Sequence, residues 1–92
     1  MRRDKPELVK VTVTIFGEEY TIKGDEKPEY MEMIASYVDR KMHAISQRSP
    51  NLTISKVAVL TALNLADELS KLQEDYDELV RTLEEARSNR TG

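Results

Sequence analysis

Apolar and polar residues alternate along the N-terminal part of the chain, which is the pattern of half-buried β-strands. The segment 9–16 reads Val-Lys-Val-Thr-Val-Thr-Ile-Phe, and the segment 20–23 alternates in the same way. Valine, isoleucine and threonine are β-branched and suit strands. Gly17 and Glu18 lie between the segments, and a type II′ turn prefers glycine at its first position. The pattern therefore predicts a β-hairpin with a two-residue turn at Gly17 and Glu18.

That turn fixes the expected register of the hairpin. It pairs Ile15 with Tyr20 and Val13 with Ile22, and it places all four side chains on one face. Phe16 falls on the opposite, polar face. We therefore expect one fully apolar face and a second face that is not completely solvated.

Two helical patterns follow the hairpin. The first helix is expected from about residue 26 to residue 47, with Asp25 as N-cap and Pro28 in the first turn, where a missing N–H is tolerated. Ser-Pro-Asn at 49–51 breaks it, and Thr53 is the expected N-cap of the second helix. The apolar residues of the first helix form a stripe at helical spacing: Tyr30, Met33, Ile34, Tyr37, Val38, Met42 and Ile45.

The last third of the chain indicates one uninterrupted helix with an apolar seam. Spacings of four and three alternate along it, which is the heptad pattern of coiled coils. Roughly 34 residues at a rise of ~1.5 Å make a rod about 50 Å long. No other segment remains to cover the seam, so we expect a second copy of the chain to cover it. The predicted interface consists of Ala58, Ala62, Leu65, Leu69, Leu72, Tyr76, Leu79 and Leu83.

These patterns predict an α+β fold, with an N-terminal β-hairpin and helix forming a head and one long C-terminal helix forming a coiled-coil rod. Residues 1–8 are expected to be a loose tail, 9–66 the head, 67–88 the rod and 89–92 a second tail. The start of the second helix, 54–66, has almost no polar face, so it should pack on the head and also meet the partner chain. Val80 widens the apolar strip beside the seam, so both a dimer and a tetramer remain open.

Charge is distributed unevenly along this 92-residue chain of net charge −3. Acidic residues dominate the predicted rod, which speaks against wrapping nucleic acid or binding anionic lipid. A basic stretch without acids runs from residue 40 to residue 56. It suits an acidic protein partner, and a solvated face beside a loop is the alternative interpretation. Its basic residues are Arg40, Lys41, Arg48 and Lys56.

The sequence offers no convergent chemistry. Cysteine is absent, and His43 is the single histidine, so thiol catalysis is excluded and a zinc site is not expected. His43 lies on the polar face of the first helix and is expected to be an ordinary surface residue. The methionines at 31, 33 and 42 are expected in the core. No signal-peptide pattern or apolar run of ~18 residues occurs. We therefore expect a cytoplasmic protein that is not an enzyme and has no cofactor.

Two strings resemble the ZapA family, whose members associate with the FtsZ ring in cell division. Residues 11–22, Val-Thr-Val-Thr-Ile-Phe-Gly-Glu-Glu-Tyr-Thr-Ile, resemble the N-terminal hairpin of the family. Residues 61–69, Thr-Ala-Leu-Asn-Leu-Ala-Asp-Glu-Leu, resemble its Ala-Leu-Asn stretch, where head becomes rod. The similarity covers roughly residues 9–85, and the short rod resembles the version found in Gram-positive bacteria.

The resemblance implies a dimer, able to form tetramers, that binds FtsZ polymers at midcell. It further implies that the protein crosslinks and bundles FtsZ protofilaments, stabilises the ring and lowers FtsZ GTPase activity. Some members carry a basic residue after the hairpin glycine, where this chain has Glu18, so the basic stretch at 40–56 is the expected FtsZ contact. The alternative is a homo-oligomeric adaptor for another acidic protein.

Overall fold

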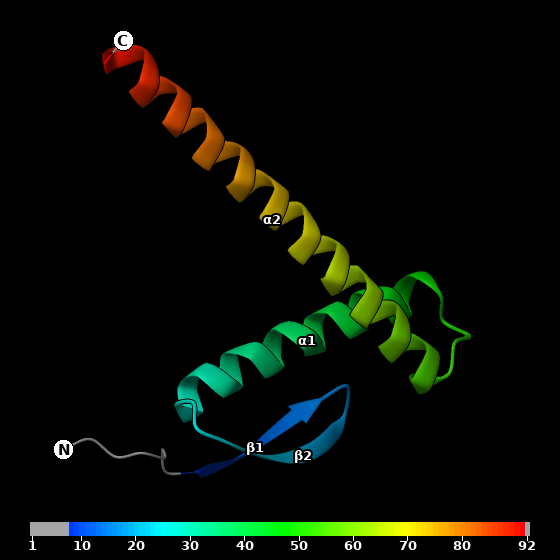
Figure 1. Cartoon of the computed structure of the whole chain (residues 1–92). Coiled ribbons are helices and arrows are strands. Elements are labelled where there is room, and N and C mark those ends of the chain that lie inside the picture. The colour runs from blue at the N-terminus through cyan, green and yellow to red at the C-terminus, as the bar shows by residue number, and fades with distance from the viewer. Residues whose placement is uncertain (1–7, 92) are drawn as a thin grey trace, which may run out of the picture. The chain divides into compact units, whose positions relative to one another are not determined.

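The computed structural model describes residues 8–91, with side chains for residues 8–89. The expected tail at 1–8 therefore lies outside the described residues except for Leu8. The order of elements confirms the predicted hairpin, helix and long C-terminal helix (Figure 1): β1 (Val9–Ile15), β2 (Glu18–Gly24), α1 (Pro28–Arg48) and α2 (Ile54–Thr91). The chain divides into two compact units, Met1–Thr61 and Ala62–Gly92.

The strands pair as an antiparallel hairpin, but in a different register from the expected one. Val13 lies opposite Tyr20 and Ile15 opposite Glu18, so the turn is formed by Phe16 and Gly17. Both turn residues have positive φ, 53° and 83°, as a type I′ turn requires. The predicted type II′ turn at Gly17 and Glu18 is therefore wrong. The predicted face is right, because the two registers differ by two residues and an even shift keeps each side chain on its face.

A residue from a distant part of the chain contacts this turn. A phenylalanine at positive φ is strained, and local preference alone would place only the glycine there. The Phe16 N–H donates a hydrogen bond of 2.7 Å to the Asp39 carboxylate on α1. The observed turn is therefore accompanied by a tertiary hydrogen bond, which the local sequence pattern does not report.

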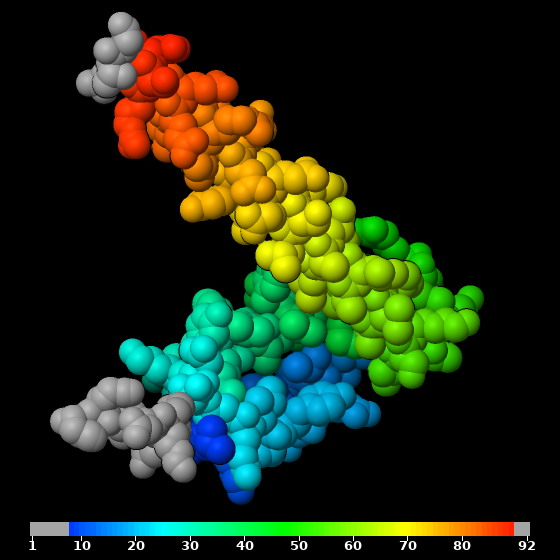
Figure 2. Space-filling model, in the orientation of Figure 1, coloured from blue at the N-terminus to red at the C-terminus, as the bar shows by residue number. Residues whose placement is uncertain are grey.

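The core of the head lies between β1 and α1. Among the described elements, α1 packs against β1, and its backbone does not approach that of β2. In Figure 2 the side chains of α1 lie directly on the hairpin. Every residue of β2 before Gly24 is exposed, so one strand of the hairpin carries most of the packing. The buried cluster and its partly buried neighbours are Val11, Val13, Ala35, Val9, Ile15 and Met31.

α1 carries two apolar faces where the sequence pattern suggested one. The inner face is buried or half-buried and includes Met31, Ala35, Val38, Met42 and Ile45. The outer face is 41–58% exposed and consists of Tyr30, Met33, Ile34 and Tyr37. The expectation of core methionines is thus right for Met31 and Met42 and wrong for Met33. The prediction of a single apolar stripe on this helix is therefore wrong. The spacing of apolar residues is the same on a buried face and on an exposed one, so the sequence pattern did not distinguish the two faces.

The helix ends follow the expected chemistry in part. α1 begins at Pro28 with Lys27 as N-cap and no side-chain cap, so the expected cap at Asp25 is wrong. Thr53 does cap α2, because its Oγ1 accepts the Lys56 N–H at 3.3 Å. α2 then runs without a break to Thr91, past the expected end of the rod at residue 88.

The first two turns of α2 belong to the head unit and are partly buried. Val57 is 2% exposed and Thr61 is 3% exposed. The Thr61 hydroxyl donates to the Val57 carbonyl oxygen at 2.7 Å, so its burial leaves no polar group unsatisfied. The residues between them, Val59 and Leu60, are exposed. This segment therefore packs on the head with one side and leaves another side apolar and open.

Candidate self-association and partner-binding surfaces

The expected seam along α2 is uncovered in the single chain. Within the unit Ala62–Gly92, its large side chains are between 57% and 66% exposed: Leu69, Leu72, Tyr76, Leu79 and Leu83. Ala58 and Ala62 are also exposed, whereas Leu65 and Val80 are half-buried. An exposed apolar strip of this length on one helix is a feature of interaction surfaces.

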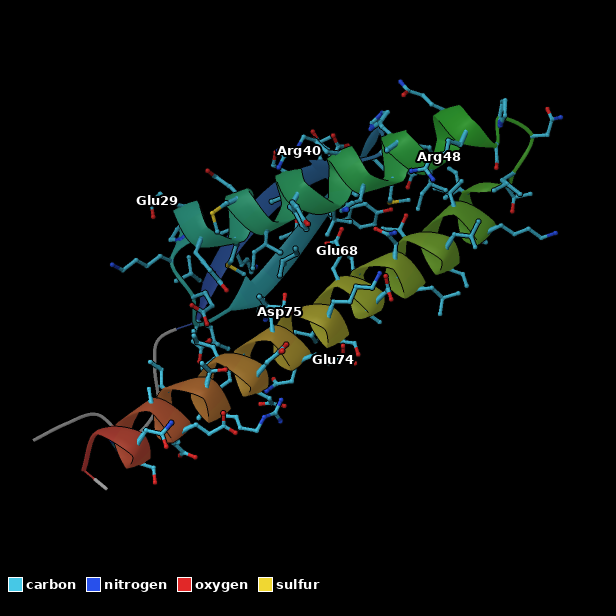
Figure 3. The ribbon with its side chains drawn as sticks, turned by 90° about the horizontal axis from the view of Figure 1, so that it is seen from above. Glu29, Arg40, Arg48, Glu68, Glu74 and Asp75 are labelled. Carbon is cyan, nitrogen blue, oxygen red and sulfur yellow. The ribbon has the colours of Figure 1, made fainter. Side chains whose placement is uncertain are left out.

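The remaining surface of α2 is polar and mainly acidic. Glu74 and Asp75 project from it (Figure 3). Lys71 forms an ion pair with Asp67 at 3.1 Å, and both side chains are more than half exposed. Such exposed pairs add little stability. The acidic face is therefore exposed to solvent, and the apolar strip lies uncovered on the same helix.

The basic stretch collects on α1 and the first turn of α2. Arg40 and Arg48 both come from α1 (Figure 3). Arg40 donates to the Ser36 hydroxyl at 3.0 Å, and its Cζ lies 5.7 Å from the centre of the Tyr37 ring. Lys41 Nζ lies 5.5 Å from the same ring. Two cationic side chains therefore lie near the same aromatic ring. The face of an aromatic ring attracts positive charge.

The other two residues of the basic stretch end α1 and begin α2. Arg48 is the last residue of α1, and Lys56 lies in the first turn of α2. Both are exposed. All four predicted residues of the basic stretch belong to the head unit, Met1–Thr61, so the structure brings them onto one compact part of the chain.

A shallow apolar groove adjoins the basic stretch. It has a volume of about 540 Å³ and is lined by Met33, Ile34, Ser36, Tyr37 and Arg40. Tyr20 and Ile22 of β2 are also exposed, by 45% and 36%. The alternation and the helical stripe predicted a covered face for these side chains. The expected stripe on the first helix has seven apolar side chains, and a two-stranded hairpin is all that they have to pack on. This mismatch was the signal that part of the stripe stays open.

A second cluster joins the hairpin turn to α1. Besides accepting the Phe16 N–H, Asp39 accepts a hydrogen bond on its backbone carbonyl oxygen from His43 Nδ1 at 2.9 Å. The His43 and Phe16 rings meet edge to face, with centroids 5.0 Å apart. The His43 side chain is 54% exposed, as expected of a surface residue. Its contacts with Phe16 and Asp39 were not predicted from the sequence. The one signal for them was that Phe16, an apolar residue, falls on the polar face of the predicted hairpin.

Two observations concern other kinds of site. Among residues 8–91, acidic and histidine side chains nowhere gather in groups of three or more that suit a metal ion. Within the same residues, neither helix has an apolar stretch of the length that a bilayer requires.

Comparison with known proteins identifies the lineage of the chain. The sequence model of the family described as "Cell division protein ZapA" matches residues 11–91. The chain belongs to the ZapA family. Its members are cell division proteins rather than enzymes, and the resemblance noted in the hairpin and in the Ala-Leu-Asn stretch is thereby confirmed.

ZapA proteins of Gram-positive bacteria are similar to the chain over most of its length. The cell division protein ZapA of Geobacillus thermodenitrificans is 48% identical over 80 residues, which are 87% of each chain. That of Bacillus subtilis is 45% identical over 76 residues, which are 83% of this chain and 89% of the relative. The expected likeness to short Gram-positive members is thus confirmed.

Two solved structures share the fold of the chain. A ZapA mutant dimer from Geobacillus stearothermophilus superposes with a TM-score of 0.68 at 39% identity, covering 91% of this chain and 98% of the other. A conserved bacterial protein of unknown function from Pseudomonas aeruginosa PAO1 gives a TM-score of 0.69 at 31% identity, covering 83% and 85%. The hairpin, α1 and long α2 are therefore a ZapA arrangement.

Proposed function

We propose that this ZapA-family chain is a self-associating scaffold that binds FtsZ polymers and crosslinks them into bundles. In this role it stabilises the division ring at midcell and lowers the GTPase activity of FtsZ by holding subunits in polymers. Self-association first gives a dimer, and pairing of dimers through the rods gives a tetramer.

The distribution of the two surfaces carries this proposal. Most of the apolar seam belongs to the unit Ala62–Gly92, whereas the basic stretch belongs to Met1–Thr61. Association through the seam thus does not bury the basic stretch, and each assembly presents at least two heads. Two tethered heads bind a filament lattice far better than one, because the second contact forms at a high effective concentration.

The basic stretch is the proposed contact with FtsZ. Arg40, Lys41 and Arg48 present positive charge on one helix, and Lys56 adds a fourth cation nearby in sequence. FtsZ, the partner implied by the family resemblance, is acidic. Complementary charge of this kind raises the association rate and makes binding sensitive to salt.

Light scattering and pelleting of purified FtsZ with GTP test the proposal. Adding the protein should increase scattering, move FtsZ into the pellet and produce bundles in electron micrographs. Leu79→Glu should bind polymers and bundle them poorly, whereas the matched variant Ser70→Glu, which adds the same charge at an exposed position outside the seam, should bundle them normally. Unchanged FtsZ at low salt, with a wild-type protein shown to be oligomeric, would refute the proposal and favour an adaptor for another acidic protein.

A further inference from the structure

The turn of the hairpin can close in two ways, and local sequence favours the one that is not observed. In the observed register the turn is Phe16–Gly17, with a phenylalanine at positive φ. In the alternative the turn is Gly17–Glu18, in which only glycine needs positive φ. Local backbone preference alone therefore favours the alternative register.

The burial of apolar side chains does not favour one register over the other. They differ by a slide of two residues, about 7 Å along the strand, and an even slide keeps every side chain on its face. The β2 residues on the inner face, Tyr20 and Ile22, are 45% and 36% exposed. α1 rests on β1 rather than on β2, so β1 keeps its packing whichever residues of β2 lie opposite.

The two registers differ in the hydrogen-bond partner of one backbone N–H, that of Phe16. In a two-residue loop closed by Ile15 and Glu18, the Phe16 N–H has no partner in the ladder. In the alternative register Phe16 lies opposite Glu19, and its N–H bonds to the carbonyl of Glu19. A nearby acceptor for the Phe16 N–H therefore stabilises the observed register alone.

Asp39 is that acceptor. Its carboxylate receives the Phe16 N–H at 2.7 Å from α1, 23 residues away, and hydrogen bonds to a charged group are the stronger kind. His43 contacts both residues of this hydrogen bond. Its Nδ1 donates to the Asp39 carbonyl oxygen, and its ring packs edge to face against that of Phe16. The strained turn is thus held at its backbone and at its side chain.

We propose that Asp39 is a register-selecting residue, which captures the Phe16 N–H and so fixes which residues of β2 lie opposite β1. The consequence reaches the surface of the head. A slide of β2 moves the exposed Tyr20 and Ile22, and the free edge of this strand, by about 7 Å relative to α1. Asp39 therefore determines which of two surfaces the head presents, and this selection requires no bound partner.

A three-cysteine reporter reads the register directly, because the chain has no cysteine of its own. Thr12→Cys, Thr14→Cys and Thr21→Cys place three thiols on the exposed face of the hairpin. In the observed register position 21 lies opposite position 12, and the two threonine hydroxyls are 3.1 Å apart. In the alternative register position 21 lies opposite position 14. Directly opposite positions suit a disulfide, and diagonal ones are too far apart.

Mild oxidation of the full-length reporter, followed by peptide mapping of the intramolecular disulfides, gives the ratio of 12–21 to 14–21 bonds. The 12–21 bond should dominate in the reporter alone. Asp39→Ala should lower the ratio roughly tenfold or more, because a hydrogen bond to a charged acceptor is lost. Asp39→Asn keeps a neutral acceptor oxygen and should lower the ratio less than Asp39→Ala does, because neutral hydrogen bonds are weaker than charged ones. Glu29→Ala, which removes an exposed carboxylate from the first turn of the same helix, should leave the ratio unchanged.

A rescue separates register selection from simple stabilisation. Asparagine tolerates positive φ far better than phenylalanine, so Phe16→Asn combined with Asp39→Ala should restore the 12–21 bond. An unchanged ratio in folded Asp39→Ala would overturn the proposal. A ratio equal to that of the urea-unfolded reporter, without rescue by Phe16→Asn, would overturn it as well, because Asp39 would then hold the hairpin together rather than choose its register.

Discussion

Leu79→Glu tests whether copies of the chain meet through the seam. In the single chain the Leu79 side chain is 57% exposed. Fully burying a leucine contributes about 1.5–3 kcal/mol, so covering the exposed part contributes roughly 1–2 kcal/mol in each chain. The substitution removes this term from both chains that meet at the seam, about 2–4 kcal/mol, and adds the cost of desolvating two carboxylates. We therefore expect the dissociation constant of the rod contact to rise roughly 30- to 1000-fold.

Sedimentation equilibrium over a range of protein concentrations measures this change. The wild type should give the mass of a dimer or tetramer, and Leu79→Glu should give a smaller mass at the same concentration. Ser70→Glu introduces the same charge on the same helix at an exposed position and should match the wild type. If a dimer survives in Leu79→Glu while a tetramer is lost, the heads hold the dimer and the rods join dimers. Equal masses for Leu79→Glu and the wild type would refute the seam as an interface.

Three further outcomes follow from the head. Thr53→Ala removes the cap of α2 and should cost about 1 kcal/mol, which lowers Tm by roughly 4–8 °C in calorimetry; Thr53→Ser should restore most of the loss. Val57→Ala opens a cavity at a side chain that is 2% exposed and should cost about 2 kcal/mol in urea unfolding, so an unchanged midpoint would contradict the packing. Changing Arg40, Lys41 and Arg48 together to Glu should abolish co-sedimentation with FtsZ while leaving the oligomer mass intact; retained binding would exclude the basic stretch as the contact.

The sequence pattern predicted the elements of this protein better than their pairing. Alternation identified both strands and the inward face of Val13, because side-chain direction is set by a period of two. The register depends on a hydrogen bond between Phe16 and Asp39, which are 23 residues apart. Local turn preference contains no information about that bond, so it favoured the wrong turn. The cap of α2 at Thr53 was predictable because its donor lies only three residues away.

The candidate surfaces were predictable to different degrees. The seam could be read from heptad spacing, because every large residue in it faces the same side of one helix. The outer apolar face of α1 could not be predicted in this way. Spacing shows which residues lie on the same side of a helix, but it does not show whether the rest of the chain covers them. Tyr37 illustrates this limit: the same residue that fits a core stripe is 41% exposed and lies beside Arg40 and Lys41.

Tyr76, in the middle of the proposed seam, offers an optical test of whether a second chain covers that surface. The chain has four tyrosines and no tryptophan, so tyrosine emission is not masked by a stronger fluorophore. Tyr76 is the one tyrosine in the sequence after residue 61 and is 62% exposed in the single chain. When a second helix covers it, its ring moves from water into an apolar contact. The difference in emission between the wild type and Tyr76→Phe, followed upon dilution, therefore records seam closure without any attached dye.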